Sequence, residues 1–519
     1  MPRWAGPGGY RPHYAADTVP LDPRTPVIVG VGQVTDRPGD PEPDHQKEPL
    51  GLMVAALRAA LADAGGNANR LASAVGSIRV VRSLTWNVPD PGALIAKELG
   101  MDPTESVHSS IGGNTPQALL ADSAAAIQAG ALEAVVVVGA ESGYSRARAR
   151  RMGERLTFTE QDEATLPAVA FGTDRAPTSE TEAARGLTLP VNVYPLIENA
   201  IRLEAGLTRS EHLARIGALW SKFSQVAAAN PFAWSRRALG PEEVVGPTGD
   251  NRMIAFPYPK LCTANIQVDQ GAGLLVVSAE LAEAAGVPGD RWVFPLAGAE
   301  ANDHWFLSER ADLSRSPAIA LAGRRALELA GVGIDDVAVA DLYSCFPCAV
   351  QLGARELGLA IDGDVGRLTQ TGGLTFGGGP GNNYVSHGIS SLVSSLRARP
   401  GSVGLATGLG WYATKHAVGV YSTEPPAAGF RSEKVQPAVD RLERWVEDPD
   451  ATGPADVETF TVTYSREGEP ERGIVSCRTG ERTRTWANLS DPDQLAELVG
   501  AERAGWSGTL SAGGRFELA

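Results

Sequence analysis

Two glycine-rich turns are the segments of this 519-residue chain best suited, by residue type and spacing, to hold a reacting group. The first reads Ser-Ser-Ile-Gly-Gly-Asn-Thr-Pro-Gln-Ala over residues 109–118, and the second reads Gly-Gly-Gly-Pro-Gly-Asn-Asn over residues 377–383. Each opens a predicted helix, whose first N–H groups can bind a carbonyl or phosphate oxygen that glycine allows to come close. The alternative is that these glycines only permit tight turns beneath the helices. The segment Gly-Leu-Gly at residues 408–410 is added to the two turns. The predicted substrate-binding residues are Gly112, Gly113, Asn114, Gly378, Gly379, Gly408 and Gly410.

Two further candidates stand at the end of a strand predicted over residues 337–343. Reacting groups in open α/β sheets lie outside such carboxyl ends, so we predict Cys345 and Tyr343 as catalytic candidates. A packed structural thiol is the alternative for Cys345. Cys345-Phe-Pro-Cys348 also has the spacing of a thioredoxin-type redox motif, although no separate thioredoxin-sized unit surrounds it. His387, which follows the second turn, is predicted to be a core or surface histidine.

Composition excludes several classes of function. A formal net charge of −15 leaves no excess of Lys and Arg to neutralise phosphates, which argues against nucleic-acid binding. The 4 cysteines exclude a disulfide scaffold, and the 7 histidines include no pair at ligand spacing, so no metal is expected. No apolar run approaches the ~20 residues that span a bilayer. Residues 1–25 lack the apolar core of a signal peptide, so we expect a poorly ordered leader on a cytoplasmic protein.

Alternating strand and helix patterns predict a mostly parallel sheet with helix cover. Gly113 and Val135 are separated by 22 positions, as are Gly381 and Val403, which indicates an internal duplication. We therefore predict an α/β fold of two duplicated halves, with an inserted loop domain and a C-terminal domain. The predicted boundaries are the leader at 1–25, the first half at 26–143 (resuming near 251–280), the insertion at 144–250, the second half at 281–423, a linker at 424–440 and the last domain at 441–519.

The last domain differs in kind from the rest of the chain. Residues 457–464 alternate in the manner of a half-buried strand, and further strand candidates follow at 472–479, 482–490 and 515–518. A short helix is expected after Asp491, a candidate cap. Several short strands in so small a domain favour a small antiparallel, OB-like β-barrel. Because a Pro-rich linker precedes it, we expect the chain up to about Glu424 to fold without this barrel.

Several segments resemble those of the thiolase superfamily, in the same order. Residues 130–142 resemble the family's helix end, buried strand and Gly-Gly-x-Glu-Ser turn, and residues 268–273 its Asp-Gly-Ala-Ala segment. Thr371-Gly-Gly-Leu374 resembles the approach to the family's histidine turn. Asp341-Leu-Tyr-Ser-Cys-Phe346 is similar to the Glu-Leu-His-Asp-Cys-Phe motif of the sterol-carrier-protein type. The resemblance covers about residues 26–423, and with the barrel the chain resembles actinobacterial thiolase-like proteins of type 1. It implies the thiolase fold, with both halves in one layered core.

The resemblance also implies that the groups of thiolase chemistry are missing. The nucleophilic cysteine of the family would fall on Gly112 or Gly113, and its catalytic histidine on Gly379. The cysteine that moves the α-proton would fall on Ala406, and the Asn or His of the remaining motif on Tyr343. An acyl-cysteine cannot form at a glycine, so we expect no thiolytic cleavage or Claisen condensation by the usual route.

Three functions remain open on the sequence. The first is an acyl-CoA-binding protein of lipid or sterol metabolism, with a CoA thioester as ligand and no tightly bound cofactor. The second is an acyltransferase or lyase with a non-standard site around Cys345 and Tyr343, and the third a non-catalytic scaffold that meets a protein partner through its barrel. If the first holds, a bulky residue at Gly113 or Gly379 should weaken binding without unfolding the chain.

A cluster of arginines in the predicted insertion would suit the phosphates of coenzyme A through charge-assisted hydrogen bonds. A solvated helix or loop face is the alternative. The predicted phosphate-binding residues are Arg146, Arg148, Arg150 and Arg151, with Arg155 close behind them.

Overall fold

The computed structural model describes residues 21–38, 48–502 and 505–519. The predicted leader therefore lies outside the described residues, except for positions 21–25. No helix in the described ranges is long and apolar enough to cross a bilayer.

The first sheet has six strands in the spatial order β1-β8-β4-β2-β3-β5. The strands β2 to β5 pair in parallel, whereas β8 lies antiparallel between β1 and β4. Every residue of β4 is buried, as expected of a Val-rich strand covered on both faces. The strands are β1 (Pro26–Thr35), β2 (Val75–Val80), β3 (Glu105–Ser109), β4 (Ala134–Ser142), β5 (Val169–Phe171) and β8 (Asp269–Ser278).

The second sheet has five strands in the order β10-β11-β12-β9-β13. The pairs β10–β11 and β9–β13 are parallel, and the other two are antiparallel. Residues 424–440, for which a linker was predicted, include β13 and so are partly held by this sheet. The strands are β9 (Phe294–Asn302), β10 (Val337–Asp341), β11 (Val403–Gly410), β12 (Lys415–Ser422) and β13 (Arg431–Lys434).

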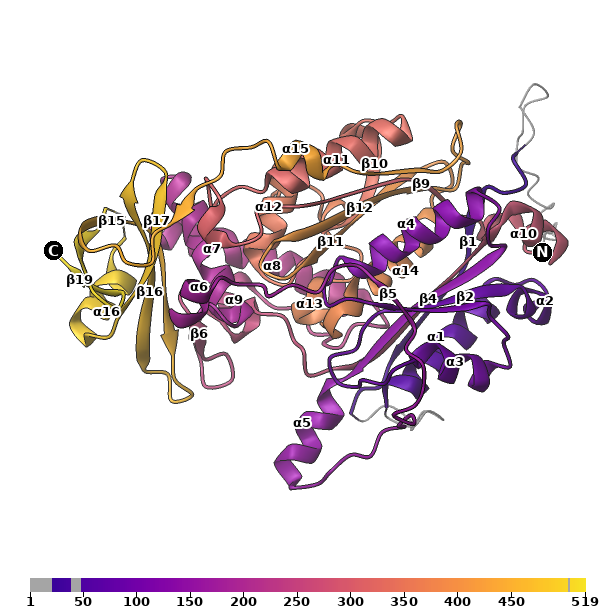
Figure 1. Ribbon diagram of the computed structural model, residues 1–519, viewed down its shortest axis with the longest axis horizontal. Helices are drawn as coiled ribbons and strands as arrows, with labels where there is room; N and C mark the ends of the chain where they lie inside the picture. The colour runs from indigo at the N-terminus through magenta and orange to yellow at the C-terminus, as the bar shows by residue number, and fades with distance from the viewer. Residues whose placement is uncertain (1–20, 39–47, 503–504) are drawn as a thin grey trace, which may run out of the picture.

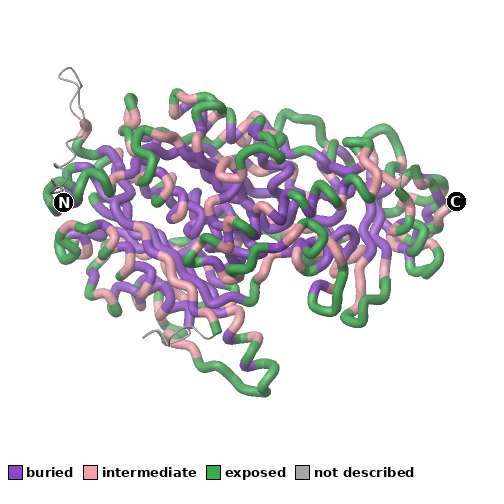
Figure 2. The backbone as a smooth tube through the Cα atoms, turned by 180° about the vertical axis from the view of Figure 1, so that it is seen from behind, coloured by how far each residue is buried: buried purple, intermediate pink, exposed green. Residues whose placement is uncertain are grey.

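Two helices lie between the sheets, and each follows one of the glycine turns. The helices α4 (Thr115–Gln128) and α14 (Tyr384–Arg397) contact strands of both sheets, while α1 (Pro49–Asp63) packs on the first sheet and α11 (Pro317–Ala330) on the second (Figure 1). Figure 2 shows that buried residues run through the sheets and that exposed residues gather on outer helices and loops. The other helices of the two halves are α2 (Ala68–Ser73), α3 (Pro91–Leu99), α10 (Ala279–Ala284), α12 (Pro347–Leu357), α13 (Gly373–Phe376) and α15 (Gln436–Val439).

The segment between β4 and β8 is mainly helical. Its first helix, α5, starts where β4 ends and projects from the body of the molecule (Figure 1). Thr208 caps α8 in a capping box with Glu211, as its Thr-x-x-Glu sequence requires. The elements are α5 (Gly143–Met152), α6 (Glu180–Ala184), α7 (Pro190–Glu204), α8 (Arg209–Ala229), α9 (Pro241–Val245), β6 (Met253–Ala255) and β7 (Tyr258–Pro259).

The C-terminal region forms a closed barrel of five strands, as predicted. Four neighbouring pairs are antiparallel, but the pair β17–β19 that closes the barrel is parallel. Asp491 caps the helix α16 (Pro492–Gly500) by accepting from the N–H groups of Asp493 and Gln494. The barrel strands are β15 (Gly453–Tyr464), β16 (Pro470–Gly480), β17 (Thr483–Leu489), β18 (Ser507–Ser511) and β19 (Arg515–Leu518).

The barrel has a hydrophobic cluster of its own, and it also packs against the rest of the molecule. β6 of the inserted segment pairs with β15, and α7 packs against the same strand. Asn199 Nδ2 donates to the carbonyl of Phe460 (2.8 Å), and Thr459 Oγ1 to that of Leu196 (2.6 Å). Trp486 belongs to the main hydrophobic core rather than to the barrel's own. A chain cut at about Glu424 would expose these surfaces, so its solubility and folding test the prediction that the core folds without the barrel.

Candidate functional site

The first glycine turn joins β3 to α4 and leaves no empty space at its centre. A Cβ atom added to Gly113 would collide with the hydroxyl of Tyr343 and lie 2.6 Å from the carbonyl oxygen of Leu409. Atoms of the second half fill the space beside this glycine. Gly113 is glycine because the second half of the protein comes too close for any other residue.

Two of the other predicted glycines pack against the same turn. A Cβ at Gly408 would lie 2.8 Å from the Cα of Asn114, and one at Gly410 would lie 3.0 Å from the Cα of Gly112. Gly112 donates its N–H to Asn382 Oδ1 of the second turn, at 3.0 Å. The structure therefore brings Gly112, Gly113, Asn114, Gly408 and Gly410 together, and Asn382 ties the second turn to them.

Gly378 and Gly379 have other neighbours. A Cβ at Gly378 (φ +115°) would collide with the Gln270 side chain, and one at Gly379 would lie 3.2 Å from the carbonyl oxygen of Asn265. Gln270 Nε2 donates to the carbonyl of Gly377 at 2.9 Å, while its Oε1 is buried without a partner. These two glycines support the second turn, and no hydrogen bond joins them to the first.

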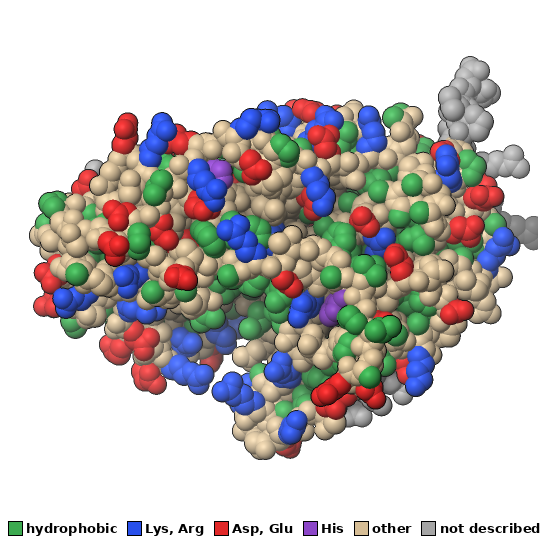
Figure 3. Space-filling view, in the orientation of Figure 1, with side chains coloured by type: hydrophobic (Ala, Val, Ile, Leu, Met, Phe, Trp, Pro, Cys, Tyr) green, Lys and Arg blue, Asp and Glu red, His purple; other side chains and the backbone are tan. Residues whose placement is uncertain are grey.

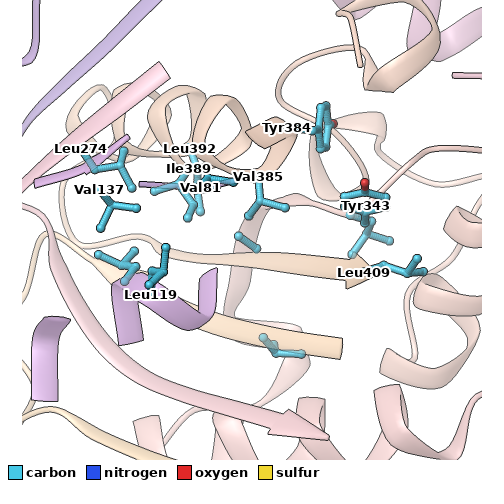
Figure 4. Close-up of a cluster of buried hydrophobic side chains, with 14 of the residues drawn as sticks. Val81, Leu119, Val137, Leu274, Tyr343, Tyr384, Val385, Ile389, Leu392 and Leu409 are labelled. Carbon is cyan, nitrogen blue, oxygen red and sulfur yellow. The ribbon is translucent and has the colours of Figure 1, made fainter. Parts of the chain in front are cut away.

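Tyr343 fills the space between the two halves. Its side chain is buried, its N–H donates to Thr407 Oγ1 (2.8 Å), and its ring meets that of Tyr384 edge-on with centroids 5.5 Å apart. Figure 4 shows the two tyrosines near the end of the strand that carries Leu409. Burial raises the pKa of Tyr343 far above its usual range, so its hydroxyl stays protonated at neutral pH.

Cys345 is a thiol, not a thiolate, in this environment. Burial raises its pKa to about 12, against the opposing effect of a hydrogen bond with Tyr194. Cys348 is fully buried and its Sγ lies 3.4 Å from the carbonyl oxygen of Tyr194. Both cysteines are free. The reactivity that a redox pair or a nucleophile requires is not favoured here.

Asp341, close to Tyr343, begins the motif that resembles the sterol-carrier-protein type, but it was not predicted as a site residue. Asp341 ends β10, and burial raises its pKa despite the donors that surround it. Tyr384 donates its hydroxyl to Asp341 Oδ1 (3.0 Å), and Gln370 its N–H to Oδ2 (2.8 Å). These bonds hold the β10 end against the second turn, which is a positioning task.

Lys415 lies at the first turn but stands in no motif that would have singled it out. It is 4% exposed, and its Nζ donates to the carbonyl oxygens of Ile111 (2.8 Å) and Thr173 (2.7 Å). Burial lowers its pKa. Its Cδ would lie 3.4 Å from a Cβ at Gly112, so the lysine stem lines the turn.

The predicted arginine cluster lies on α5, away from both turns. Arg146, Arg148, Arg150 and Arg151 are all exposed, and Figure 3 shows Lys and Arg side chains gathered on this projection. Arg146 donates to the carbonyl of Leu84 at 3.3 Å, and Arg151 to Gln267 Oε1 at 3.5 Å. None of the hydrogen bonds between described residues links these arginines to a glycine turn.

His387 lies in α14 behind the second turn, 4% exposed, with its Nδ1 2.9 Å from Gln33 Oε1. Burial lowers its pKa from 6.5 to about 3.

Below pH 6.5 the unfolded chain therefore binds a proton at His387 that the folded protein does not, and stability falls as the pH drops toward 3. His387→Gln removes this term, so the variant should lose about 2 kcal/mol less stability than the unmodified protein between pH 7.5 and pH 5. Urea unfolding at both pH values checks this; identical losses would contradict it.

Two layered halves whose glycine turns meet at one edge define a protein of thiolase fold, and comparisons with known proteins agree. Residues 299–389 match a family model described as thiolase C-terminal domain-like, and residues 434–515 match the thiolase-like protein type 1 additional C-terminal domain. The crystal structure of a monomeric SCP2-thiolase-like protein type 1 from Mycobacterium smegmatis is 34% identical, with a TM-score of 0.80, and the match covers 96% of this chain and 100% of that one. The chain belongs to the SCP2-thiolase-like protein type 1 family.

More distant relatives extend the likeness. An acetyl-CoA acetyltransferase of Methanocaldococcus jannaschii is 25% identical over 53% of this chain and 62% of its own length. The benzoylsuccinyl-CoA thiolase subunit BbsB of Thauera aromatica is 26% identical over 38% of this chain and 49% of its own. The chain thus spans about half to three fifths of these curated relatives. The peroxisomal thiolase of Saccharomyces cerevisiae, at 12% identity and a TM-score of 0.53 over 78% of this chain and 98% of that one, shares the fold alone.

Proposed function

We propose that this protein binds an acyl-CoA thioester where its two glycine turns meet, without forming an acyl-cysteine. Two of the relatives, the acetyl-CoA acetyltransferase and the benzoylsuccinyl-CoA thiolase subunit, are named for CoA thioesters, and this chain has the thiolase fold. The observation that carries the proposal is the first turn, where glycines of both halves lie against Asn114 and no cysteine stands. Lipid or sterol metabolism is the setting that the resemblance implies.

Thiolytic turnover is not part of the proposal. The positions that correspond to the thiolase nucleophile and histidine hold Gly112 or Gly113 and Gly379, and the remaining thiol, Cys345, has a pKa near 12. The second candidate, an acyltransferase or lyase that uses Cys345 and Tyr343, would need one of these groups ionised near neutral pH. Burial opposes this for both.

Tyr343 sets the condition for binding. Because its ring occupies the space beside Gly113, the ring must turn away before an acyl group can reach the turn. The exposed arginines Arg146, Arg148, Arg150 and Arg151 remain our candidates for the CoA phosphates, since guanidinium groups suit phosphate oxygens and α5 starts at the same sheet edge. The barrel remains a candidate surface for a protein partner.

Calorimetric titration with acetyl-CoA and a longer acyl-CoA tests the proposal. We expect binding, and we expect Tyr343→Ala to bind the longer thioester about tenfold more tightly, because the site is already open. Tyr343→Phe is the matched control: it keeps the ring and should bind like the unmodified protein. Absence of binding by every form would contradict the proposal. So would thiolytic cleavage of acetoacetyl-CoA at ordinary thiolase rates.

A further inference from the structure

A short strap covers the first glycine turn. It comprises residues 172–176 (Gly-Thr-Asp-Arg-Ala) and continues from β5, which pairs with β3 just before the turn. The strap is exposed, whereas Ser110, Gly112 and Asn114 beneath it are buried. Its first residue, Gly172, has φ +89°, and a Cβ there would lie 2.5 Å from Ser110 Oγ, so the chain can cross the turn at this height only with glycine.

Aromatic side chains hold the far end of the strap. The guanidinium of Arg175 lies over the rings of Trp305 (5.1 Å) and Phe306 (4.8 Å). The indole N–H of Trp305 donates to the carbonyl of Ala176 at 2.8 Å. Contacts of this kind are individually weak, so the strap is fastened at points that can separate without disturbing either sheet.

The middle of the strap places a carboxylate on a cationic site. Asp174 Oδ1 accepts from the N–H of Ile111 (3.2 Å), and its Oδ2 accepts from Arg82 Nη1 (3.3 Å). Lys415 donates to the carbonyl of the preceding residue, Thr173, at 2.7 Å. One guanidinium and one backbone N–H thus bind the carboxylate that the strap supplies, and the Lys415 ammonium binds the carbonyl of the residue before it.

Lys415 is an unusual cation for a protein interior. No Asp or Glu in the described ranges forms an ion pair with it, although Asp174 is close enough to favour its charged form. A buried ammonium without a direct ion pair is unfavourable, and here two carbonyl oxygens, the Ser110 hydroxyl and the Trp305 ring at 5.8 Å compensate it in part. Such a group would gain from an anion placed beside it.

We propose that Lys415, Arg82 and the Ile111 N–H form a carboxylate-binding site that Asp174 occupies while the strap is closed. The inference rests on the proposed function and names its substrate class: a CoA thioester whose acyl group ends in a carboxylate. That carboxylate replaces the Asp174 carboxylate when the strap opens. The acyl chain then runs from the site to the glycine turn, which the Lys415 stem already lines.

Opening the strap and binding the anion are coupled by hydrogen bonding. Lifting residues 172–176 removes Thr173 O from Lys415 and the Asp174 carboxylate from Ile111 and Arg82. Ile111 and Arg82 lose the carboxylate, and Lys415 loses one of its two carbonyl acceptors, in one movement. A ligand carboxylate can accept from all three donors, whereas an uncharged acyl chain cannot replace the lost acceptors. The strap therefore selects for a terminal negative charge.

Titration with glutaryl-CoA and with pentanoyl-CoA, whose acyl group has the same chain length but no charge, tests this selection. We expect glutaryl-CoA to bind about tenfold more tightly. Lys415→Met should abolish the preference. Arg82→Gln should abolish it too, and because the Arg82 side chain is partly exposed, this substitution should leave the fold intact. Asp174→Asn should tighten glutaryl-CoA binding several-fold, because the competing charge is gone. Asp162→Asn is the matched control, since Asp162 is also exposed and also accepts a backbone N–H, from Ala164.

The outcomes separate this inference from the proposed function. Equal affinity for the two thioesters would overturn the carboxylate site and leave thioester binding intact. Binding of free glutarate that Lys415→Met abolishes, without binding of any thioester, would support the carboxylate site and remove the proposed function. Binding of neither glutarate nor a thioester would overturn both.

Discussion

Arg484→Ala is expected to lower the free energy of unfolding by about 3–5 kcal/mol. Arg484 is fully buried where the barrel meets the core, and its Nε and Nη2 each donate to the Glu458 carboxylate at 2.7 Å. Its Nη1 also donates to the carbonyls of Leu307 (2.9 Å) and Arg310 (2.6 Å) in the second half. Alanine would leave the Glu458 carboxylate buried without its main partner and would remove a donor from the Leu307 and Arg310 carbonyls.

Urea unfolding measures this loss, and Arg482→Ala is its control. Arg482 stands two positions earlier but is exposed, and its ion pair with Glu443 lies in solvent. Removing an exposed pair should change the free energy of unfolding by less than about 1 kcal/mol. Similar effects of the two substitutions would contradict the role we give to the buried arginine, and would favour the barrel as a separately folding unit.

Gly113→Ala is expected to cost about 3 kcal/mol of stability, although it adds a single methyl group. That methyl would meet the hydroxyl of Tyr343 and lie 2.6 Å both from its Cζ and from the carbonyl oxygen of Leu409. Leucine at this position would meet the same atoms, so we expect it to lower stability as well as to weaken binding. Gly379→Leu should disturb the structure less than a substitution at Gly113, because the nearest atom to a Cβ at Gly379 is 3.2 Å away.

Thermal or urea unfolding of Gly113→Ala can be compared with that of Gly289→Ala. No atom lies within 4 Å of a Cβ at Gly289, so this control should be close to neutral. Tyr343→Ala in the same chain as Gly113→Ala should recover part of the loss, since two of the three close atoms belong to Tyr343. A Gly113→Ala protein as stable as the control would mean that the turns do not pack as closely as described.

The fold could be predicted because its signals are local. The buried strand at Ala134–Ser142, the helix starts after each glycine turn and the alternation at residues 457–464 are each legible within a dozen residues. Their order along the chain then indicated the superfamily. The convergence of the two turns followed from the duplication, and the hydrogen bond from Gly112 to Asn382, 270 positions apart, joins them.

What fills and covers the site could not be predicted in this way. Tyr343 reaches Gly113 from the other half of the protein, and Lys415 reaches Thr173 across 242 positions. Neither residue stands in a motif that specifies its partner, and an isolated lysine in a sequence is ordinarily a solvated one. The parallel closure of the barrel was missed for the same reason, because the pairing of β17 with β19 depends on where the chain returns after α16.

Mass spectrometry of the protein mixed with an acyl-CoA tests the central claim most directly. Under native conditions we expect a complex whose mass equals protein plus one intact acyl-CoA, since the site binds the thioester without reacting with it. Under denaturing conditions the same sample should return the mass of the unmodified chain. An acyl adduct that survives denaturation, or no complex in the native spectrum at any thioester concentration, would contradict the account.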